Sequence, residues 1–178
     1  MRKEILSLVI LSGLSLQAEG LYTGLDFQAG SGKHELTIDD VVVSNSDSLS
    51  ASSFGLHVGY EIIPNGSIEL SYGALSLEDD DITKIGLDFL QKFPVSSALS
   101  PYVGLGVSTN SISDSNVETG LGARLRLGAY YEIIPNLDIG AEVNYNYISW
   151  ESATDYLGRE WELSSSYYGL GLNVNYKF

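Results

Sequence analysis

The last eleven residues of the chain show a strict alternation of apolar and polar positions. From Tyr168 to Phe178, one parity carries only apolar or aromatic side chains, and the other carries glycine, asparagine and lysine. Successive side chains of a β-strand point to opposite faces of the sheet, so this segment is predicted to be a strand with one oily face and one polar face. We expect it to be the closing strand of a β-barrel.

The same alternation predicts seven more strands upstream. On one parity of each, the side chains are apolar or aromatic apart from one threonine and one glutamine, and none is charged and none is glycine. These positions are Leu21, Thr23, Leu25, Phe27 and Ala29; Phe54, Leu56, Val58, Tyr60 and Ile62; Ile68, Leu70, Tyr72 and Ala74; Ile85, Leu87, Phe89, Gln91 and Phe93; Val103, Leu105 and Val107; Leu121, Ala123, Leu125, Leu127, Ala129, Tyr131 and Ile133; and Leu137, Ile139, Ala141, Val143, Tyr145 and Tyr147.

The opposite parity carries the glycines and the charges. It holds 14 of the chain's 19 glycines. Its titratable positions are Asp26, His57, Glu61, Glu69, Lys84, Asp88, Lys92, Arg124, Arg126, Glu132, Asp138 and Glu142, and Lys177 shares the parity in the last strand. Acids and bases are mixed along these strands, so the polar face can pair its own charges.

The capacity of the lumen decides which face points inward. A lipocalin-type barrel also alternates, but with its oily face inside. Eight strands enclose room for roughly a dozen side chains, and the oily parity holds about forty. We therefore predict an all-β fold, an eight-stranded antiparallel up-and-down transmembrane β-barrel, with the oily face toward lipid and the charges in the lumen.

The connections between the predicted strands alternate in length. Residues 63–66, 94–100 and 135–136 form short or moderate turns, whereas residues 31–53, 76–83, 108–118 and 149–165 are predicted to be long external loops. The sequence Tyr60–Asn65 recurs as Tyr131–Asn136, each time just before a short turn. Turn chemistry of proline and asparagine explains the repeat, and so does duplication of a four-stranded half.

Residues 1–18 have the order of a secretory signal peptide. A basic start is followed by an apolar stretch from Ile5 to Leu16 and a small residue, Ala18. That stretch is too short for a membrane-spanning helix, which needs ~20 residues. We expect cleavage after Ala18, and residues 19–178 to form the barrel in the outer membrane of a Gram-negative bacterium.

Composition narrows the possible chemistry. The chain has no cysteine, which excludes disulfides and thiol chemistry. Its formal net charge of −14 makes nucleic acid an unfavourable partner, because phosphates would be repelled. With two histidines in all, a metal cage is not expected. No cofactor is predicted.

Aromatic residues gather near the ends of the predicted strands. Tyr72, Tyr145, Tyr147 and Tyr168 lie near one rim, and Tyr60, Phe93, Tyr131, Tyr176 and Phe178 lie near the other. This distribution is typical of the two aromatic girdles of a transmembrane barrel.

With these strands, connections and signal peptide, the chain resembles the small outer-membrane barrels: the OmpA-like transmembrane domain, OmpX and the opacity proteins. In that family the assembly machinery reads a C-terminal strand with alternating apolar residues and a terminal aromatic. The matching positions here are Leu172, Val174, Tyr176 and Phe178. The resemblance implies the barrel-assembly machinery, outer-membrane lipid and lipopolysaccharide as partners.

Three functions are compatible with the sequence. The preferred one is a non-enzymatic structural or surface-interaction role, with the lumen plugged by the charged network and acidic external loops as the contact surface. The first alternative is a narrow gated pore for ions or small solutes, in which Arg124 or Arg126 exchanges acidic partners. The second alternative, an outer-leaflet lipid A-modifying enzyme, is implied by the resemblance alone, since some members of that family are lipid A acyltransferases with catalytic His, Ser and Asp at the outer rim. His34, Ser76 and Asp79 are the one crude match to that set.

The acidic run at residues 78–81 falls in the second predicted external loop. Neighbouring carboxylates in an extended loop point apart, so a solvated loop is the simpler interpretation. Divalent ions bridging these acids to lipopolysaccharide are a second hypothesis.

Overall fold

The structure, a computed structural model, describes residues 20–38, 41–77, 80–112, 119–154 and 160–178. The predicted signal peptide lies outside these residues. The strands are β1 (Leu21–Ile38), β2 (Val41–Ile63), β3 (Gly66–Leu77), β4 (Asp80–Lys92), β5 (Leu99–Ile112), β6 (Thr119–Ile134), β7 (Leu137–Trp150), β8 (Ala153–Thr154) and β9 (Glu160–Lys177). No helix in the described part of the chain is long and apolar enough to cross a membrane.

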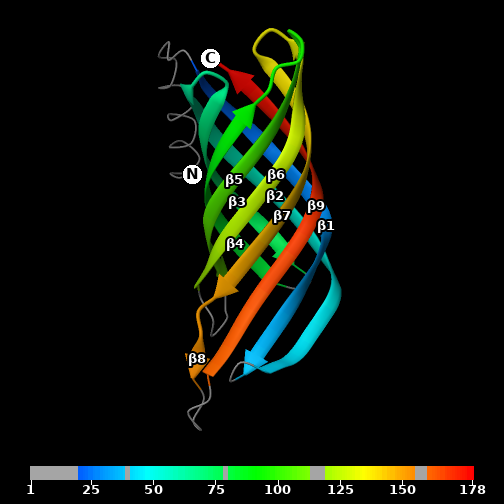
Figure 1. The fold of residues 1–178 in the computed structure, drawn as a ribbon, viewed down its shortest axis with the longest axis vertical. Helices are drawn as coiled ribbons and strands as arrows, with labels where there is room; N and C mark the ends of the chain where they lie inside the picture. Colours follow the sequence, from blue (N-terminus) through cyan, green and yellow to red (C-terminus); the bar gives the residue numbers. More distant parts are fainter. Residues whose placement is uncertain (1–19, 39–40, 78–79, 113–118, 155–159) are drawn as a thin grey trace, which may run out of the picture.

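Eight of these strands form a closed barrel. Each of β1 to β7 pairs antiparallel with the next wall strand, β7 pairs with β9, and β9 returns to β1. The two-residue β8 only adds to the edge of β9. Figure 1 shows β9 in red beside β1 in blue, where the barrel closes. The predicted eight-stranded antiparallel barrel is confirmed.

One end of the barrel, here called the short-turn end, holds the tight connections. Asn65 and Asn136 adopt left-handed backbone conformations, with φ of 61° and 73°, in the turns after β2 and β6. Asparagine tolerates this region better than most residues. Both copies of the repeated sequence also contain a register shift, between Glu61 and Ile63 and between Glu132 and Ile134. Each copy of the repeat therefore forms the same bulge and turn. Turn chemistry and duplication of a four-stranded half both predict this, so the shared geometry does not test duplication.

The opposite end, here called the long-strand end, differs from the prediction. The strands continue well into the segments predicted as loops: β1 reaches Ile38, β2 starts at Val41, and β3 and β4 reach Leu77 and Asp80. The ranges 31–53, 76–83, 108–118 and 149–165 were therefore wrong as loops for much of their length. Figure 1 shows β1, β2 and β9 extending past the strands β3 to β7 at this end.

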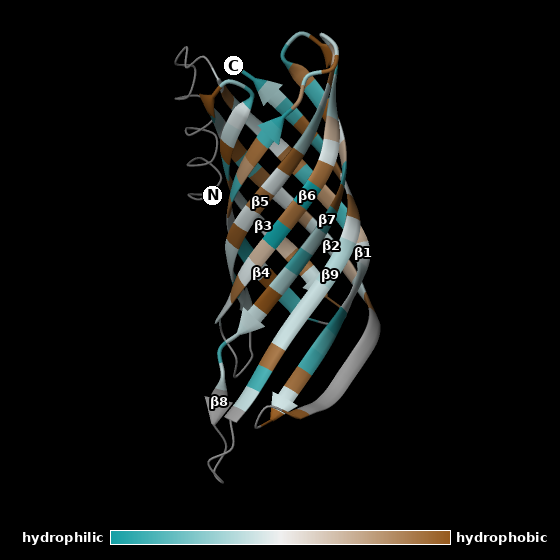
Figure 2. Ribbon diagram, in the orientation of Figure 1, coloured by the Kyte–Doolittle hydropathy of each residue, from teal (hydrophilic) through white to brown (hydrophobic). Residues whose placement is uncertain are grey.

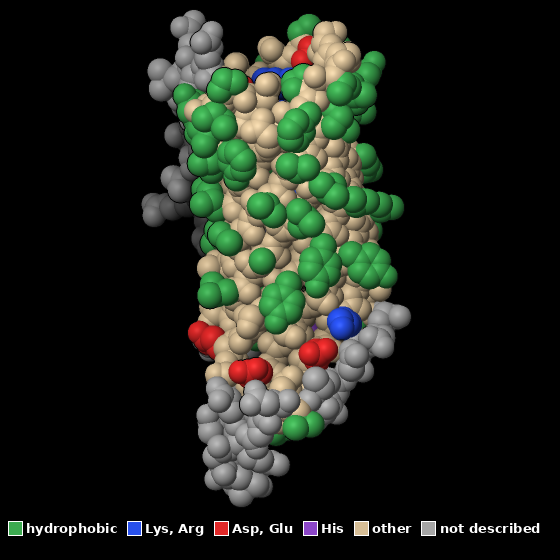
Figure 3. All heavy atoms as spheres, viewed as in Figure 1, with side chains coloured by type: hydrophobic (Ala, Val, Ile, Leu, Met, Phe, Trp, Pro, Cys, Tyr) green, Lys and Arg blue, Asp and Glu red, His purple; other side chains and the backbone are tan. Residues whose placement is uncertain are grey.

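The outer wall of the barrel is an apolar belt. Positions predicted to face lipid are widely exposed, including Leu70 at 58 %, Leu105 at 64 % and Leu172 at 65 %. The tyrosines and phenylalanines predicted for the two girdles are exposed as well. Figure 3 shows hydrophobic side chains spread over the wall, with acidic side chains gathered toward the long-strand end. Exposing such an apolar surface to water would be unfavourable in free energy, whereas the hydrocarbon chains of a bilayer are as apolar as the belt that they cover.

At the long-strand end the pattern reverses. Inside the barrel there, Leu49, Ala51, Leu75, Leu77, Ile82, Ile148, Trp150 and Tyr167 form a buried cluster, here called the apolar cluster. On the outer face the alternate residues, such as Ser76 and Ser149, are polar. Figure 2 shows brown and teal positions alternating along the strands. At this end apolar side chains point inward and polar side chains point outward, as in a water-soluble β-barrel. The same strands continue from the membrane-type wall without a break.

Candidate functional site

The centre of the lumen is a buried ion-pair network built around Arg126. Its Nη1 donates to Oε2 of Glu69 at 2.6 Å, and its Nε donates to Oε2 of Glu142 at 2.8 Å. All three residues are at most 5 % exposed. Tyr22 and Tyr102 donate their hydroxyls to Glu69 and Glu142 respectively. Charge-assisted bonds of this kind are the strong class of hydrogen bond, and each carboxylate here receives a cation and a neutral donor.

A second ion pair lies one step toward the long-strand end. The guanidinium of Arg124 donates from Nε to Asp88 Oδ1 at 2.9 Å, and its Nη2 bonds the second oxygen of the same carboxylate. Lys84 donates to Oδ1 of Asn146 at 2.9 Å and to the hydroxyl of Tyr167 at 3.3 Å. The bidentate geometry fixes both partners of the arginine pair.

His57 belongs to a third group on β1, β2 and β9. Its Nδ1 lies 2.6 Å from Oδ2 of Asp26, and its Nε2 lies 2.8 Å from Oδ1 of Asn175. Glu69 is 3.9 Å from the same ring, which joins this group to the Arg126 network. The contacts of His57 are thus with Asp26, Asn175 and Glu69.

Toward the short-turn end the lumen becomes aromatic. Tyr102 and Tyr130 stack with ring centroids 4.6 Å apart, and Leu90 packs with them. The ammonium of Lys92 lies 4.8 Å from the centroid of the Tyr22 ring and 5.7 Å from that of Tyr130. This layer separates the central ion pairs from the opening.

The opening itself carries the remaining predicted charges. Lys177 Nζ lies 2.8 Å from Asp138 Oδ2 and 3.2 Å from Glu132 Oε2, and Lys92 Nζ lies 3.4 Å from Glu61 Oε1. Glu61 and Glu132 are 43 % and 36 % exposed in their side chains. They therefore form pairs at the mouth and do not reach Arg124 or Arg126.

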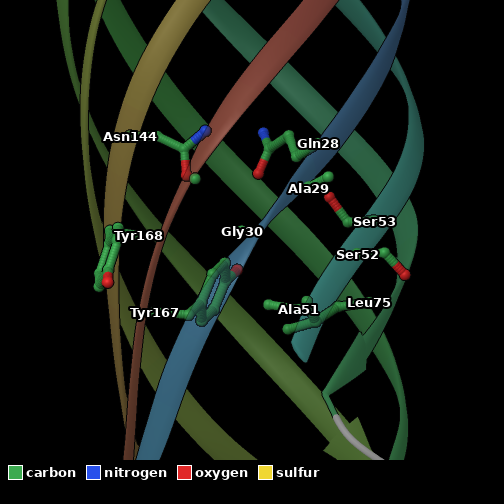
Figure 4. Close-up of a pocket in the computed structure, with 11 residues that line it drawn as sticks. Gln28, Ala29, Gly30, Ala51, Ser52, Ser53, Leu75, Asn144, Tyr167 and Tyr168 are labelled. Atoms are coloured by element: carbon green, nitrogen blue, oxygen red, sulfur yellow. The ribbon is translucent and has the colours of Figure 1, made fainter. Parts of the chain in front are cut away.

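The lumen leaves little free space. A cavity of about 10 Å³ lies where the polar network meets the apolar cluster, with Gln28 and Asn144 on one side and Tyr167, Leu75 and Ala51 on the other (Figure 4). A second cavity near Lys84 and Arg124 has about 30 Å³. A single water needs roughly 10–15 Å³. Both spaces are thus of the size of one or two waters.

The combination of His34, Ser76 and Asp79 is not assembled. His34 faces the lumen at the long-strand end, with Nδ1 2.7 Å from Ser165 Oγ and Nε2 3.9 Å from Asp80 Oδ2. Ser76 lies on the outer face of β3, and Asp79 lies outside the described residues. Ser165 is 1 % exposed, and its hydroxyl also accepts a hydrogen bond from the indole N–H of Trp150 at 2.7 Å, which places it in the packed interior.

Of the acidic run at residues 78–81, only Asp80 and Asp81 are described, and both belong to β4. The described residues include no group of three or more His, Cys, Asp or Glu side chains arranged to hold a metal ion.

Several uncharged lumen residues were not predicted to join the network, because only titratable side chains were considered, although Asn173 was placed on the polar face of the last strand. Tyr22, Tyr102, Asn144, Asn146 and Asn173 supply many of the hydrogen bonds between the charged groups. Each has the parity of the glycines and charges, so parity alone could have found them.

Comparison with known proteins extends this picture. Residues 5–178 match the family model described as the outer membrane protein beta-barrel domain. Comparison with curated protein sequences gives no match.

Several solved structures are similar in fold. The crystal structure of Neisserial surface protein A has 23 % identity and a TM-score of 0.63, and the alignment covers 90 % of this chain and 98 % of that one. The N-terminal β-barrel domain of OprF from Pseudomonas aeruginosa has 19 % identity and a TM-score of 0.56, with 87 % and 97 % covered. The outer membrane enzyme PagL has 13 % identity and a TM-score of 0.54, with 84 % and 97 % covered. At these identities the likeness concerns the fold alone.

Proposed function

Since the chain belongs to the outer membrane protein β-barrel domain family, we propose that it is a non-enzymatic barrel with a closed lumen and a structural or surface-interaction role. Barrels of this kind have short periplasmic turns and longer extracellular segments. The short-turn end then faces the periplasm, and the long-strand end stands at the cell surface.

The observation that carries the proposal is the apolar cluster above the ion-pair network. Leu77 and Ile82 are at most 1 % exposed inside the barrel, and Trp150 is 4 % exposed. A solute crossing the lumen would have to separate these side chains and then break the Arg124 and Arg126 pairs. Breaking a buried pair leaves uncompensated charge, which costs about 3–5 kcal/mol.

The surface role is supported by the length of the strands. β1, β2 and β9 continue beyond the apolar belt as a hydrogen-bonded ribbon, with Leu36 opposite Leu163 and Ile38 opposite Trp161. The apolar cluster lies inside the barrel at this end and gives the described strands there a packed core. Binding surfaces are commonly loops positioned by such a scaffold.

The partners follow from the same proposal. Leu172, Val174 and Tyr176 lie on the outer face of β9, and Phe178 directly follows the strand. All four are 39–65 % exposed, which suits recognition of this strand by the barrel-assembly machinery before the barrel closes. Outer-membrane lipid and lipopolysaccharide would cover the belt and the surface end.

The narrow pore remains the alternative, and conductance distinguishes the two. We expect refolded mature protein in planar bilayers to give no steady conductance, because the apolar cluster and the ion pairs fill the lumen. A large porin recorded in the same bilayers serves as the positive control. Stable channels that Arg124→Ala or Arg126→Ala alters would support the pore and contradict the closed barrel.

A further inference from the structure

The short-turn end of the barrel contains a polar pocket that the closed lumen does not use. Its volume is about 140 Å³, far more than the two spaces deeper in the lumen. It is lined by the ends of the wall strands, with Glu61, Lys92, Ser100, Glu132, Asp138 and Lys177, and by the connection after β4, with Pro94, Ser97 and Ala98.

The charges of the pocket favour a cation. Three carboxylates, those of Glu61, Glu132 and Asp138, face two lysines. Asp138 is 5 % exposed, and while its Oδ2 bonds Lys177, its Oδ1 is a buried oxygen with no hydrogen-bond partner among the described residues. A buried acceptor without a donor is costly, so a ligand that donates a hydrogen bond there would be stabilised.

The two lysines of the pocket indicate which cation fits. Lys177 holds its ammonium between two carboxylates, at 2.8 and 3.2 Å. The ammonium of Lys92 lies over the rings of Tyr22 and Tyr130 and beside the carboxylate of Glu61. Both arrangements bind a primary ammonium on an alkyl chain, through charged hydrogen bonds in one case and through cation–π contact in the other.

We propose that this pocket binds a small primary alkylammonium ion from the periplasm, with Asp138 and Glu132 accepting its hydrogen bonds. The described residues offer no cluster suited to a bare metal ion, which needs several converging oxygens. An ammonium needs only two or three acceptors on one side, and its alkyl chain can lie against the aromatic layer. The proposal is independent of whether the lumen conducts.

The test is calorimetric titration of refolded mature barrel with putrescine. Asp138→Asn should weaken binding by at least about tenfold, because it replaces a charged acceptor by a neutral one. The matched control is Asp80→Asn, which removes the same charge at the long-strand end, where the Asp80 side chain is 50 % exposed. Equal weakening by both substitutions would mean general attraction to an acidic protein and would overturn the proposal.

A second variant keeps the test decisive if Asp138→Asn does not fold on a heat-modifiability gel. Lys177→Gln removes the ammonium that competes for Asp138 and Glu132, so it should tighten putrescine binding by about tenfold. Unchanged or weaker binding in this variant would overturn the proposal.

Three comparison ligands define the chemistry. Butanediol has a similar length without charge and should not bind; binding as tight as that of putrescine would contradict the assignment. Magnesium binding that depends on Asp138 and displaces putrescine would make this a divalent-cation site and overturn the proposal. The peptide Gly-Lys-Gly separates two sources of the same group: tighter binding than putrescine indicates a lysine of a partner protein, and weaker binding indicates a free amine.

Discussion

Replacement of Arg126 by alanine is expected to destabilise the barrel by about 3–5 kcal/mol, because it leaves two buried carboxylates without their cation. Glu69 and Glu142 both bond this guanidinium at 2.6–2.8 Å, and both are almost fully buried. Tyrosine hydroxyls remain as donors to each acid, but they do not neutralise the charge. Reversible urea unfolding of the barrel in lipid vesicles, followed by tryptophan fluorescence, measures the change.

Two controls separate charge from packing. Combining Arg126→Ala with Glu69→Gln and Glu142→Gln should recover much of the lost stability, since the uncompensated charges are then gone. Lys33→Ala removes an exposed pair with Glu35 at 3.8 Å and should change the unfolding free energy by less than about 1 kcal/mol. A loss below about 1 kcal/mol for Arg126→Ala would show that water reaches these carboxylates, and the lumen would not be closed.

Replacement of Leu77 by alanine is expected to cost about 2–5 kcal/mol, the range for deleting a fully buried leucine side chain. Leu77 has no exposed surface and lies inside the apolar cluster. The matched variant is Ser76→Ala, the neighbouring residue on the outer face of β3, which should stay within about 0.5 kcal/mol. The same unfolding experiment measures both.

This pair of variants tests the reversed pattern at the long-strand end. If this end were a set of solvated loops, Leu77 and Ser76 would be equivalent and both substitutions would be nearly neutral. Equal small effects would therefore contradict a packed core at the long-strand end.

The alternation of side chains was enough to predict the barrel. The oily parity of each strand carries no charged residue, so the alternation predicted the number of strands and the closure of the barrel. The capacity of the lumen then predicted that the oily face points outward. Loop positions were less accurate, because one rule, apolar outward, was applied throughout. Leu75, Ser76 and Leu77 still alternate, but with the apolar residues inward, and a loop was therefore predicted to begin at Ser76.

The partners of the lumen charges could not be predicted in the same way. Arg126 on β6 bonds Glu142 on the adjacent β7 but also Glu69 on β3, across the lumen. Which residues meet across a barrel depends on the tilt and stagger of its strands, and these are properties of the closed sheet. The alternation placed both Glu61 and Arg126 on the lumen face. It did not reveal that Glu61 lies at the opening and Arg126 at the centre of the lumen.

The central claim, an apolar belt around a closed lumen with the reverse arrangement above it, can be measured through single cysteines, since the chain has none of its own. Four variants, Leu70→Cys, Ser76→Cys, Leu77→Cys and Asn144→Cys, sample the belt, the two faces of the long-strand end and the lumen. A membrane-impermeant maleimide added outside intact cells should label only Ser76→Cys. Labelling of Asn144→Cys and Leu77→Cys at the same rate would contradict the claim, because the reagent would then be entering an open lumen.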